Sequence, residues 1–146
     1  LAKAAYFAGK AINLTKTTGP HALSYGFTTK FGIPHGHAVA LFLPFFIDFH
    51  KNINDETNND SRGHHFVLRQ IREIAEILSI EFNNMELEII KFYKELDIEI
   101  NFQNLDISKE GFKQALKGLN HDRLNNNPRR LNLENLDSIY TYNSKY

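Results

Sequence analysis

Hydrophobic residues recur at helical spacing along most of this chain, and this pattern predicts an all-α fold. The stretch 64–78 is the clearest case, because Val67, Ile71 and Ala75 fall on one face of a helix and polar residues fill the others. We therefore predict one domain, residues 1–146, built as a bundle of about seven helices. These cover Leu1–Thr15, His21–Phe31, His35–Lys51, His64–Leu78, a segment from Asn83 or Asn84 to Leu96, Ser108–Leu119 and a last helix that Asn132 caps.

Two segments between these predicted helices lack a helical pattern of hydrophobic residues. Residues 52–63 are polar and rich in turn formers, which predicts a loop. Residues 98–107 alternate weakly between apolar and polar, as a strand would, but no other segment nearby would pair with them. We therefore expect no sheet.

Composition narrows the classes of function. The chain has 17 basic and 17 acidic residues, so it lacks the basic field that binding to nucleic acid or an anionic membrane requires. Its longest apolar run, Ala38–Ile47, is interrupted by Pro44 and is far short of the roughly 20 residues of a membrane-spanning helix. The chain contains no Cys, which is compatible with the cytoplasm and leaves His, Asp and Glu as possible metal ligands.

Three of the seven histidines cluster in one stretch and suggest chemistry. His21 and His35 each follow a Pro that suits the first turn of a helix. The positive end of a helix dipole disfavours imidazolium, and neutral imidazole is the form that binds a metal. Only a Gly-Ile-Pro turn separates the two predicted helices, so both first turns can face one cleft. A hydrogen-bonded structural role is the alternative for each of these histidines.

A metal at this position would need further ligands. The helix dipoles repel a bare dication, and carboxylate groups would have to offset that repulsion. No acidic residue occurs between Gly9 and Ile47. A site formed by His21 and His35 is therefore incomplete within this chain.

The segment Ala5–Leu41, AYFAGKAINLTKTTGPHALSYGFTTKFGIPHGHAVAL, resembles the group III iron-containing alcohol dehydrogenases. In that family two metal-binding histidines lie on successive helices, one in a His-Ala or His-Gly context and one in a Pro-His-Gly motif fourteen residues later. His21 and His35 match both contexts and that spacing. The segment Arg123–Tyr140, RLNNNPRRLNLENLDSIY, is similar to the family's closing segment. Within the family, the sequence around His21 looks most like the sequences of the branch that reduces phosphonoacetaldehyde.

The resemblance implies the helical carboxy-terminal domain of a dehydroquinate synthase-like fold. It implies Fe²⁺ as the metal, although imidazole also suits Zn²⁺. In the family an Asp and a His on an earlier helix complete the metal site, and an amino-terminal domain binds NAD(P)(H) through a glycine-rich motif. Neither feature occurs in these residues, and the chain begins with Leu1 in the middle of a helical pattern. We therefore expect a fragment whose partner is the missing amino-terminal domain, with a homo-oligomer as a further option.

These features predict part of an oxidoreductase that interconverts an alcohol and an aldehyde, with His21 and His35 as metal ligands and phosphonoacetaldehyde as a possible substrate. The fragment alone is expected to be inactive. A non-catalytic helical module, or the remnant of a split dehydrogenase, is the alternative. A two-histidine metal hydrolase ranks last, because no carboxylate lies nearby in the sequence to act as ligand and base.

Other residues near the pair carry weaker expectations. Many relatives have a proton-relaying histidine four residues after the first ligand, where this chain has Tyr25, so Tyr25 or His37 would have to replace it. Lys16, Thr17 and Thr18 precede His21 and either bind an anionic group of the substrate or form a capping turn. The remaining histidines, namely His50, His64, His65 and His121, are expected at the surface.

Overall fold

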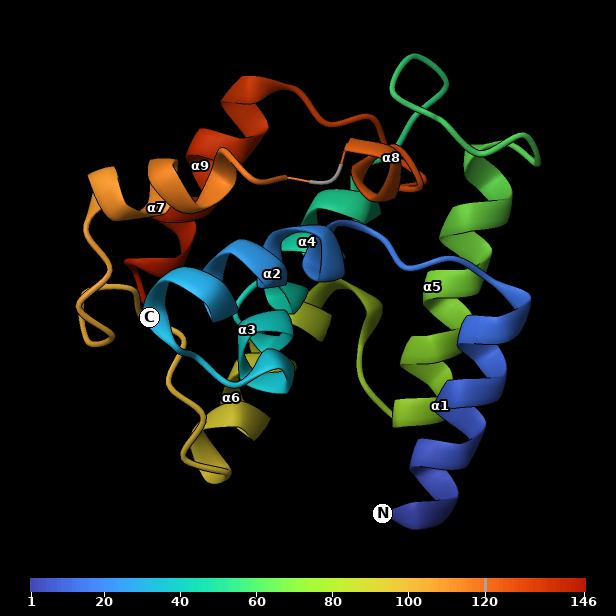
Figure 1. Ribbon diagram of the computed structural model, residues 1–146. Helices are drawn as coiled ribbons and strands as arrows, with labels where there is room; N and C mark the ends of the chain where they lie inside the picture. The colour runs from blue at the N-terminus through green and yellow to red at the C-terminus, as the bar shows by residue number, and fades with distance from the viewer. Residues whose placement is uncertain (120) are drawn as a thin grey trace.

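The computed structural model describes residues 1–119 and 121–146, and in these ranges every regular element is helical (Figure 1). The predicted all-α class is therefore confirmed. The only strand-like feature in the described ranges is an isolated bridge between Asn58 and Arg129, and residues 98–107 form turns rather than a strand. In chain order the elements are α1 (Ala2–Leu14), α2 (Gly19–Phe31), α3 (His35–Ala40), α4 (Leu43–Lys51), α5 (His64–Leu78), the 3₁₀ turn η1 (Phe82–Asn84), α6 (Met85–Glu95), α7 (Lys109–Leu116), α8 (His121–Leu124) and α9 (Leu133–Asn143).

The single helix predicted over His35–Lys51 is wrong. The structure has two helices there, α3 and α4, separated by a turn at Leu41 and Phe42. Pro44 lacks the N–H that would bond to the carbonyl four residues earlier, and it sits in the first turn of a new helix instead.

Several helix ends follow the local sequence. Gly32 ends α2 with a left-handed φ of 67°, a conformation that glycine adopts at little cost. The Ser108 side chain accepts a hydrogen bond from the Gly111 amide at the start of α7. Asn132 and Asn135 form a reciprocal capping box at the start of α9. The predicted caps at Ser108 and Asn132 are thus confirmed.

Helix α2 is the central element of the bundle, with one side in an aromatic core. Phe27 is fully buried, and its ring contacts those of Phe42, Phe102 and Phe112. Two glycines let neighbouring elements approach closely: a Cβ on Gly19 would lie 2.2 Å from the Phe46 ring, and one on Gly26 would lie 2.2 Å from the Ala115 carbonyl oxygen. Helix α2 is therefore held rigidly against α4 and α7, which positions its opposite side.

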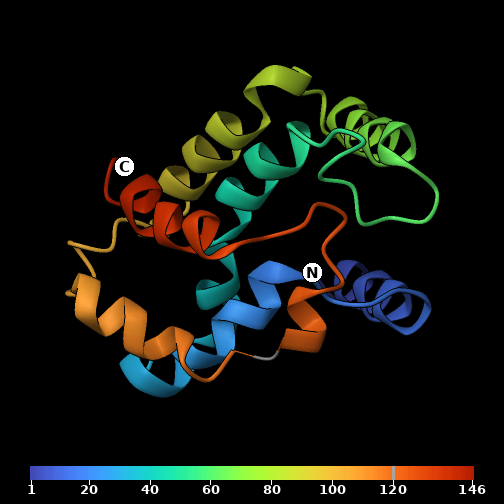
Figure 2. The ribbon, with the colours of Figure 1, turned by 90° about the horizontal axis from the view of Figure 1, so that it is seen from above.

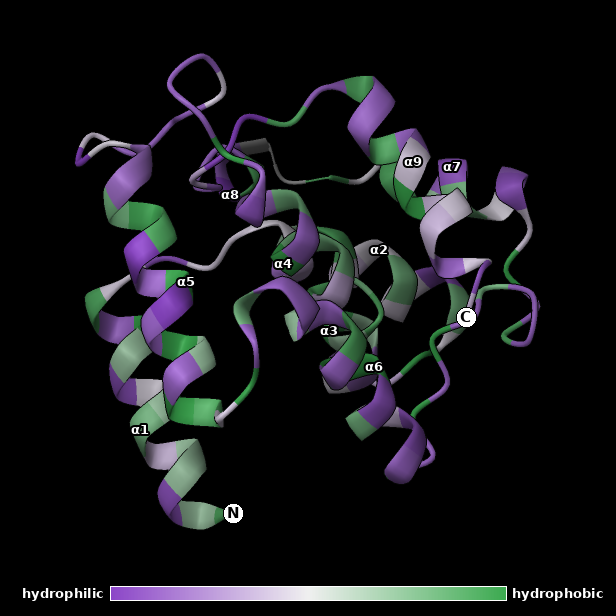
Figure 3. Ribbon diagram, turned by 180° about the vertical axis from the view of Figure 1, so that it is seen from behind, coloured by the Kyte–Doolittle hydropathy of each residue, from purple (hydrophilic) through white to green (hydrophobic). Residues whose placement is uncertain are grey.

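Helix α1 has the least contact with the rest of the molecule. None of its residues is buried, and its large apolar side chains Tyr6, Phe7, Ile12 and Leu14 are exposed. Helices α1 and α5 extend on the same side of the bundle but lie apart when seen from above (Figure 2). Hydrophobic residues are distributed along the length of α1 (Figure 3). No helix in the described ranges is both long and apolar enough to cross a membrane.

Candidate metal centre

His21 and His35 lie in the first turns of α2 and α3, as the sequence predicted. Their ring centroids are 5.2 Å apart, and the ring planes meet at 70°. Residues 32–34 connect the two helices with a left-handed turn at Gly32, and α3 packs against α2 so that the two rings come together. The His35 side chain is exposed and His21 is half-buried, so the pair faces outward from the bundle.

The electrostatic surroundings favour neutral imidazole at this position. Burial lowers the pKa of His21, and the neighbouring His35 and the Arg123 guanidinium lower it further. A neutral imidazole offers a lone pair to a cation. Two adjacent imidazole rings fit an imidazole-binding divalent ion such as Fe²⁺ or Zn²⁺.

Ser24 lies between the two histidines and connects them. Its side chain is completely buried, and its hydroxyl donates to the His21 carbonyl oxygen at 2.9 Å. The same oxygen lies 3.4 Å from Nδ1 of His35. Because the hydroxyl proton is already used, Ser24 can only accept from His35, which puts the ring proton on Nδ1 and the lone pair on Nε2. Ser24 thus sets the His35 tautomer that leaves Nε2 as a donor atom.

The described residues supply two donors and no more at this position. No group of three or more His, Asp or Glu side chains with metal-binding geometry occurs in residues 1–119 and 121–146. The pair therefore fits part of a metal site.

Tyr25 and Arg123 extend the pair on one side. The Tyr25 ring centroid lies 5.2 Å from that of His35. The Arg123 guanidinium lies over the Tyr25 ring, 4.8 Å from its centroid, and donates a hydrogen bond to the Tyr25 hydroxyl. A pocket of about 430 Å³ opens here, and its lining consists of Ile12, Lys16, Thr17, His21, Tyr25, Arg123 and Asn126.

The segment before His21 is held by a distant turn. The Thr18 side chain makes no capping hydrogen bond, so the capping turn considered for Lys16–Thr18 is not formed by that side chain. Instead the buried Asn127 Oδ1 accepts from the Gly19 amide at 3.0 Å, and Asn126 Nδ2 donates to the Thr17 carbonyl oxygen at 3.2 Å. The first turn of α2 is therefore fixed by residues more than 100 positions later in the chain.

The same turn fixes α4. Arg129 donates from Nη1 to the Phe49 carbonyl oxygen at 2.6 Å, and its guanidinium lies 4.1 Å from the centroid of the Phe49 ring. Sequence reasoning assigned no site role to Ser24, Arg123, Asn126 or Asn127. Arg123, Asn126 and Asn127 belong to the segment that is similar to the family's closing segment, but the position of this segment beside His21 has no local signal in the sequence.

The other histidines lie apart from the pair. His37 Nε2 donates to the Glu99 carbonyl oxygen at 2.5 Å, which ties that ring to the loop before α7. His65 is exposed, as expected, whereas His64 is half-buried and pairs with Asp55 at 2.8 Å. The His121 side chain lies outside the described residues.

His50, which was predicted at the surface, is half-buried. Its Nε2 is enclosed and has no hydrogen-bond partner. Burial lowers its pKa to about 4, with the Arg129 guanidinium acting in the same direction and the Asn127 side chain opposing. The ring contacts Phe46 and Phe49 on its own helix, and these aromatic neighbours cover part of it.

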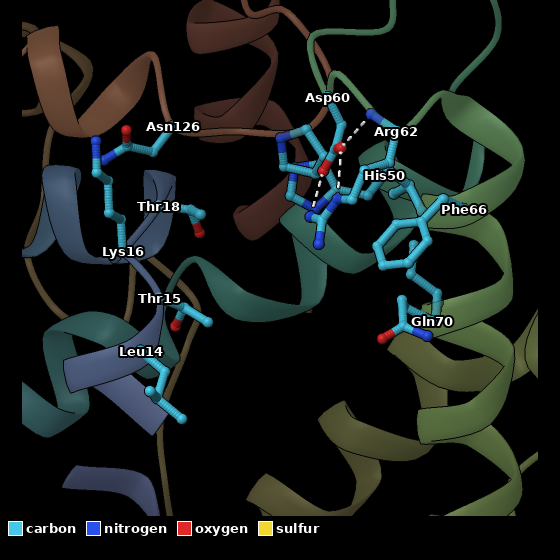
Figure 4. A pocket seen from close by; sticks show the side chains of 13 residues that line it. Leu14, Thr15, Lys16, Thr18, His50, Asp60, Arg62, Phe66, Gln70 and Asn126 are labelled. Carbon is cyan, nitrogen blue, oxygen red and sulfur yellow. Dashed lines mark hydrogen bonds and ion pairs between the residues drawn. The ribbon is translucent and has the colours of Figure 1, made fainter. Parts of the chain in front are cut away.

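His50 lines a second pocket of about 500 Å³ between the end of α1 and the start of α5 (Figure 4). Asp60 and Arg62 form an ion pair on its other wall, and hydrogen bonds from Arg62 lower the pKa of the Asp60 carboxyl. Lys16 and Asn126 line both this pocket and the one beside His21. The second pocket contains one histidine and an acid that is already paired, which makes it a poor cation site.

Comparison with known protein families identifies the family of this chain. Residues 1–144 match the carboxy-terminal domain of the Fe-containing alcohol dehydrogenase family. The chain belongs to this family. The resemblance inferred from the histidine motif and the closing segment is thereby confirmed, and so is the fold class.

Two relatives show where the match lies in longer proteins. The phosphonoacetaldehyde reductase of Streptomyces viridochromogenes is 29% identical over 139 residues, which is 95% of this chain and 34% of that protein. The crystal structure of sulfoacetaldehyde reductase from Bifidobacterium kashiwanohense in complex with NAD⁺ matches with a TM-score of 0.68 and 25% identity, over 88% of this chain and 31% of that one. This member of the Fe-containing alcohol dehydrogenase family therefore spans about a third of the length of both relatives.

Proposed function

We propose that this chain is the carboxy-terminal, metal-binding lobe of an NAD(P)(H)-dependent reductase that interconverts an aldehyde and an alcohol. His21 and His35 would be two of its metal ligands. The observation that carries the proposal is the 5.2 Å separation of their rings at adjacent helix starts. Family membership supports it independently.

In the proposed reaction a hydride passes from NAD(P)H to the carbonyl carbon, and a proton passes to the oxygen, which gives the alcohol and NAD(P)⁺. When bound, a divalent ion, Fe²⁺ or alternatively Zn²⁺, supplies Lewis-acid polarisation of the carbonyl. Of this chain's own groups, His21 and His35 hold the ion, and Ser24 orients the His35 ring.

Tyr25 is the proton carrier that we favour over His37. The Tyr25 hydroxyl accepts from Arg123, which leaves its own hydrogen to donate, and its ring lies beside His35. His37 is tied to the Glu99 carbonyl oxygen instead. Tyr25 would thus stand in for the relay histidine of other family members.

The remaining parts of the site would come from an amino-terminal domain. That domain would provide an Asp, a further His and the binding site for NAD(P)(H), and residues 1–146 would form the helical lobe. The share of the two relatives that this chain spans supports such a division. We assign the assembled enzyme to the cytoplasm and leave a homo-oligomer as an option.

The test uses full-length protein that contains these residues, loaded with Fe²⁺ or Zn²⁺. We expect NAD(P)H oxidation that depends on an aldehyde, disappears with a chelator and returns with the metal. A full-length protein that binds no metal, with a His35→Ala variant changed only in stability, would instead support the non-catalytic helical module.

A further inference from the structure

The pocket beside His21 has a pronounced charge asymmetry. Two basic residues, Lys16 and Arg123, stand among its seven lining residues, and none of the seven is acidic. The pocket also includes His21 itself, so a small molecule in it would lie next to the proposed metal. A cavity of about 430 Å³ lies within the size range typical of small-ligand sites.

The Arg123 guanidinium is held in a defined orientation. It stacks over Tyr25 and donates to the Tyr25 hydroxyl, which places the guanidinium at the edge of the pocket. The charge acts at the pair, because Arg123 is one of the groups that lower the pKa of His21. Planar guanidinium groups bind phosphonate-like and sulfonate-like oxygens through two parallel hydrogen bonds.

Lys16 lines the same pocket because the turn at Asn126 and Asn127 holds the backbone just before α2. Asn126 binds the Thr17 carbonyl oxygen, and Asn127 binds the Gly19 amide. Arg123 lies just before this turn, so one short stretch supplies one cation and pins the backbone that carries the other.

We propose that this pocket binds the tetrahedral oxyanion of a two-carbon aldehyde, a phosphonate or a sulfonate, through Arg123 and Lys16. The aldehyde carbon would then lie at the His21–His35 pair. The proposal rests on the proposed reductase function and names the class of its substrate. Both relatives are named for acetaldehydes that carry such an oxyanion, one a phosphonate and the other a sulfonate. Because a single methylene carbon separates the aldehyde group from the oxyanion in such a substrate, an anion site must adjoin the metal, as this pocket adjoins His21.

The test compares charged and uncharged substrates in full-length, metal-loaded protein. Phosphonoacetaldehyde, sulfoacetaldehyde and propanal are assayed with the wild type, with Arg123→Gln and with Lys16→Gln. We expect Arg123→Gln to lower the ratio of kcat/KM for the charged aldehydes to that for propanal by about 10- to 100-fold, the effect of losing one charged hydrogen-bonding partner. Lys16→Gln should lower it less, because Lys16 is exposed. An unchanged ratio, or equal losses for all three substrates, would overturn the proposal.

Arg72→Gln is the matched control. Arg72 also lies over an aromatic ring, Phe82, but on α5 and outside the pocket. It should leave both the ratio and the metal content unchanged. A ratio that falls equally in Arg72→Gln would mean that general surface charge, and not the pocket, is responsible.

A binding measurement separates this proposal from the reductase function. Ethylphosphonate and ethanesulfonate, which cannot be reduced, are titrated into the protein by calorimetry. Binding that weakens about 10-fold or more in Arg123→Gln supports the pocket, even if no aldehyde is turned over. A protein that reduces propanal yet binds neither anion would retain the reductase function and refute the anion site. Preference between the two anions shows which oxyanion the pocket takes.

Discussion

His35 and His37 lie two residues apart on α3, yet their surroundings differ completely. His35 faces the His21 ring and is exposed on its outer side, whereas His37 is bound to the Glu99 carbonyl oxygen. His50, like His21, has a pKa lowered mainly by burial, but its ring contacts Phe46 and Phe49 rather than another imidazole. A neutral histidine is therefore not enough for a metal site. The second ring and the open side distinguish the His21–His35 pair.

The largest predicted effect comes from replacing His35 and His37 with Ala, one at a time. In full-length protein, His35→Ala should lower metal affinity by about 100- to 1,000-fold, since a four-donor zinc site releases roughly 10–16 kcal/mol in total. His37→Ala should leave the affinity within about threefold and lower the free energy of unfolding by about 1 kcal/mol, the value of one hydrogen bond. Metal titration against a competing chelator measures the first effect, and urea unfolding measures the second. Equal losses of metal in both variants would remove the distinction between the two rings.

The second prediction concerns His50 and acid stability. Its pKa in the folded protein is about 4, against 6.5 in the unfolded chain. Below about pH 6.5 the unfolded chain gains a proton that the folded chain does not take up until about pH 4. The free energy of unfolding is therefore unaffected above pH 6.5 and falls by roughly 3 kcal/mol as the pH drops from 6.5 to 4.

Urea unfolding of the wild type and His50→Asn across this pH window isolates the effect. The slope with pH should become shallower in His50→Asn, whatever the variant does to absolute stability. His65→Asn is the control, because His65 is exposed. Identical slopes in wild type and His50→Asn would show that His50 is accessible to protons in the folded state.

The smallest predicted effect tests the orientation of His35. Ser24→Ala should weaken metal binding by about 10- to 100-fold, as loss of a group that orients a ligand does. Ser138→Ala is matched to it, because Ser138 makes the same local bond to a carbonyl three residues earlier, on α9 and apart from the pair. The two variants separate positioning of His35 from a simple loss of helix stability. Metal affinity that is unchanged in Ser24→Ala would assign Ser24 a packing role alone.

The sequence predicted the features that depend on residues close together in the chain. Periodicity and caps gave the helices, and the Pro-His pairs placed His21 and His35 in first helical turns. Pro44 could have revealed the break between α3 and α4, but the apolar run on both sides of it outweighed the missing N–H.

Contacts between residues far apart in the chain could not be predicted from local sequence patterns. Asn127 binds the Gly19 amide and Arg123 binds Tyr25, pairs that are 108 and 98 residues apart. The enclosure of His50 Nε2 depends on where α4 packs, which a polar residue near a helix end does not show. The two members of the pair were therefore predictable, whereas the pocket that adjoins it became visible only in the folded chain.

Anomalous X-ray diffraction from crystals of the full-length protein loaded with Fe²⁺ or Zn²⁺ tests the central claim most directly. The account predicts one anomalous peak bound by a ring nitrogen of His21 and a ring nitrogen of His35, each at about 2.0–2.1 Å for zinc. A metal ion bound elsewhere in the protein, or held by only one of these two rings, would contradict it.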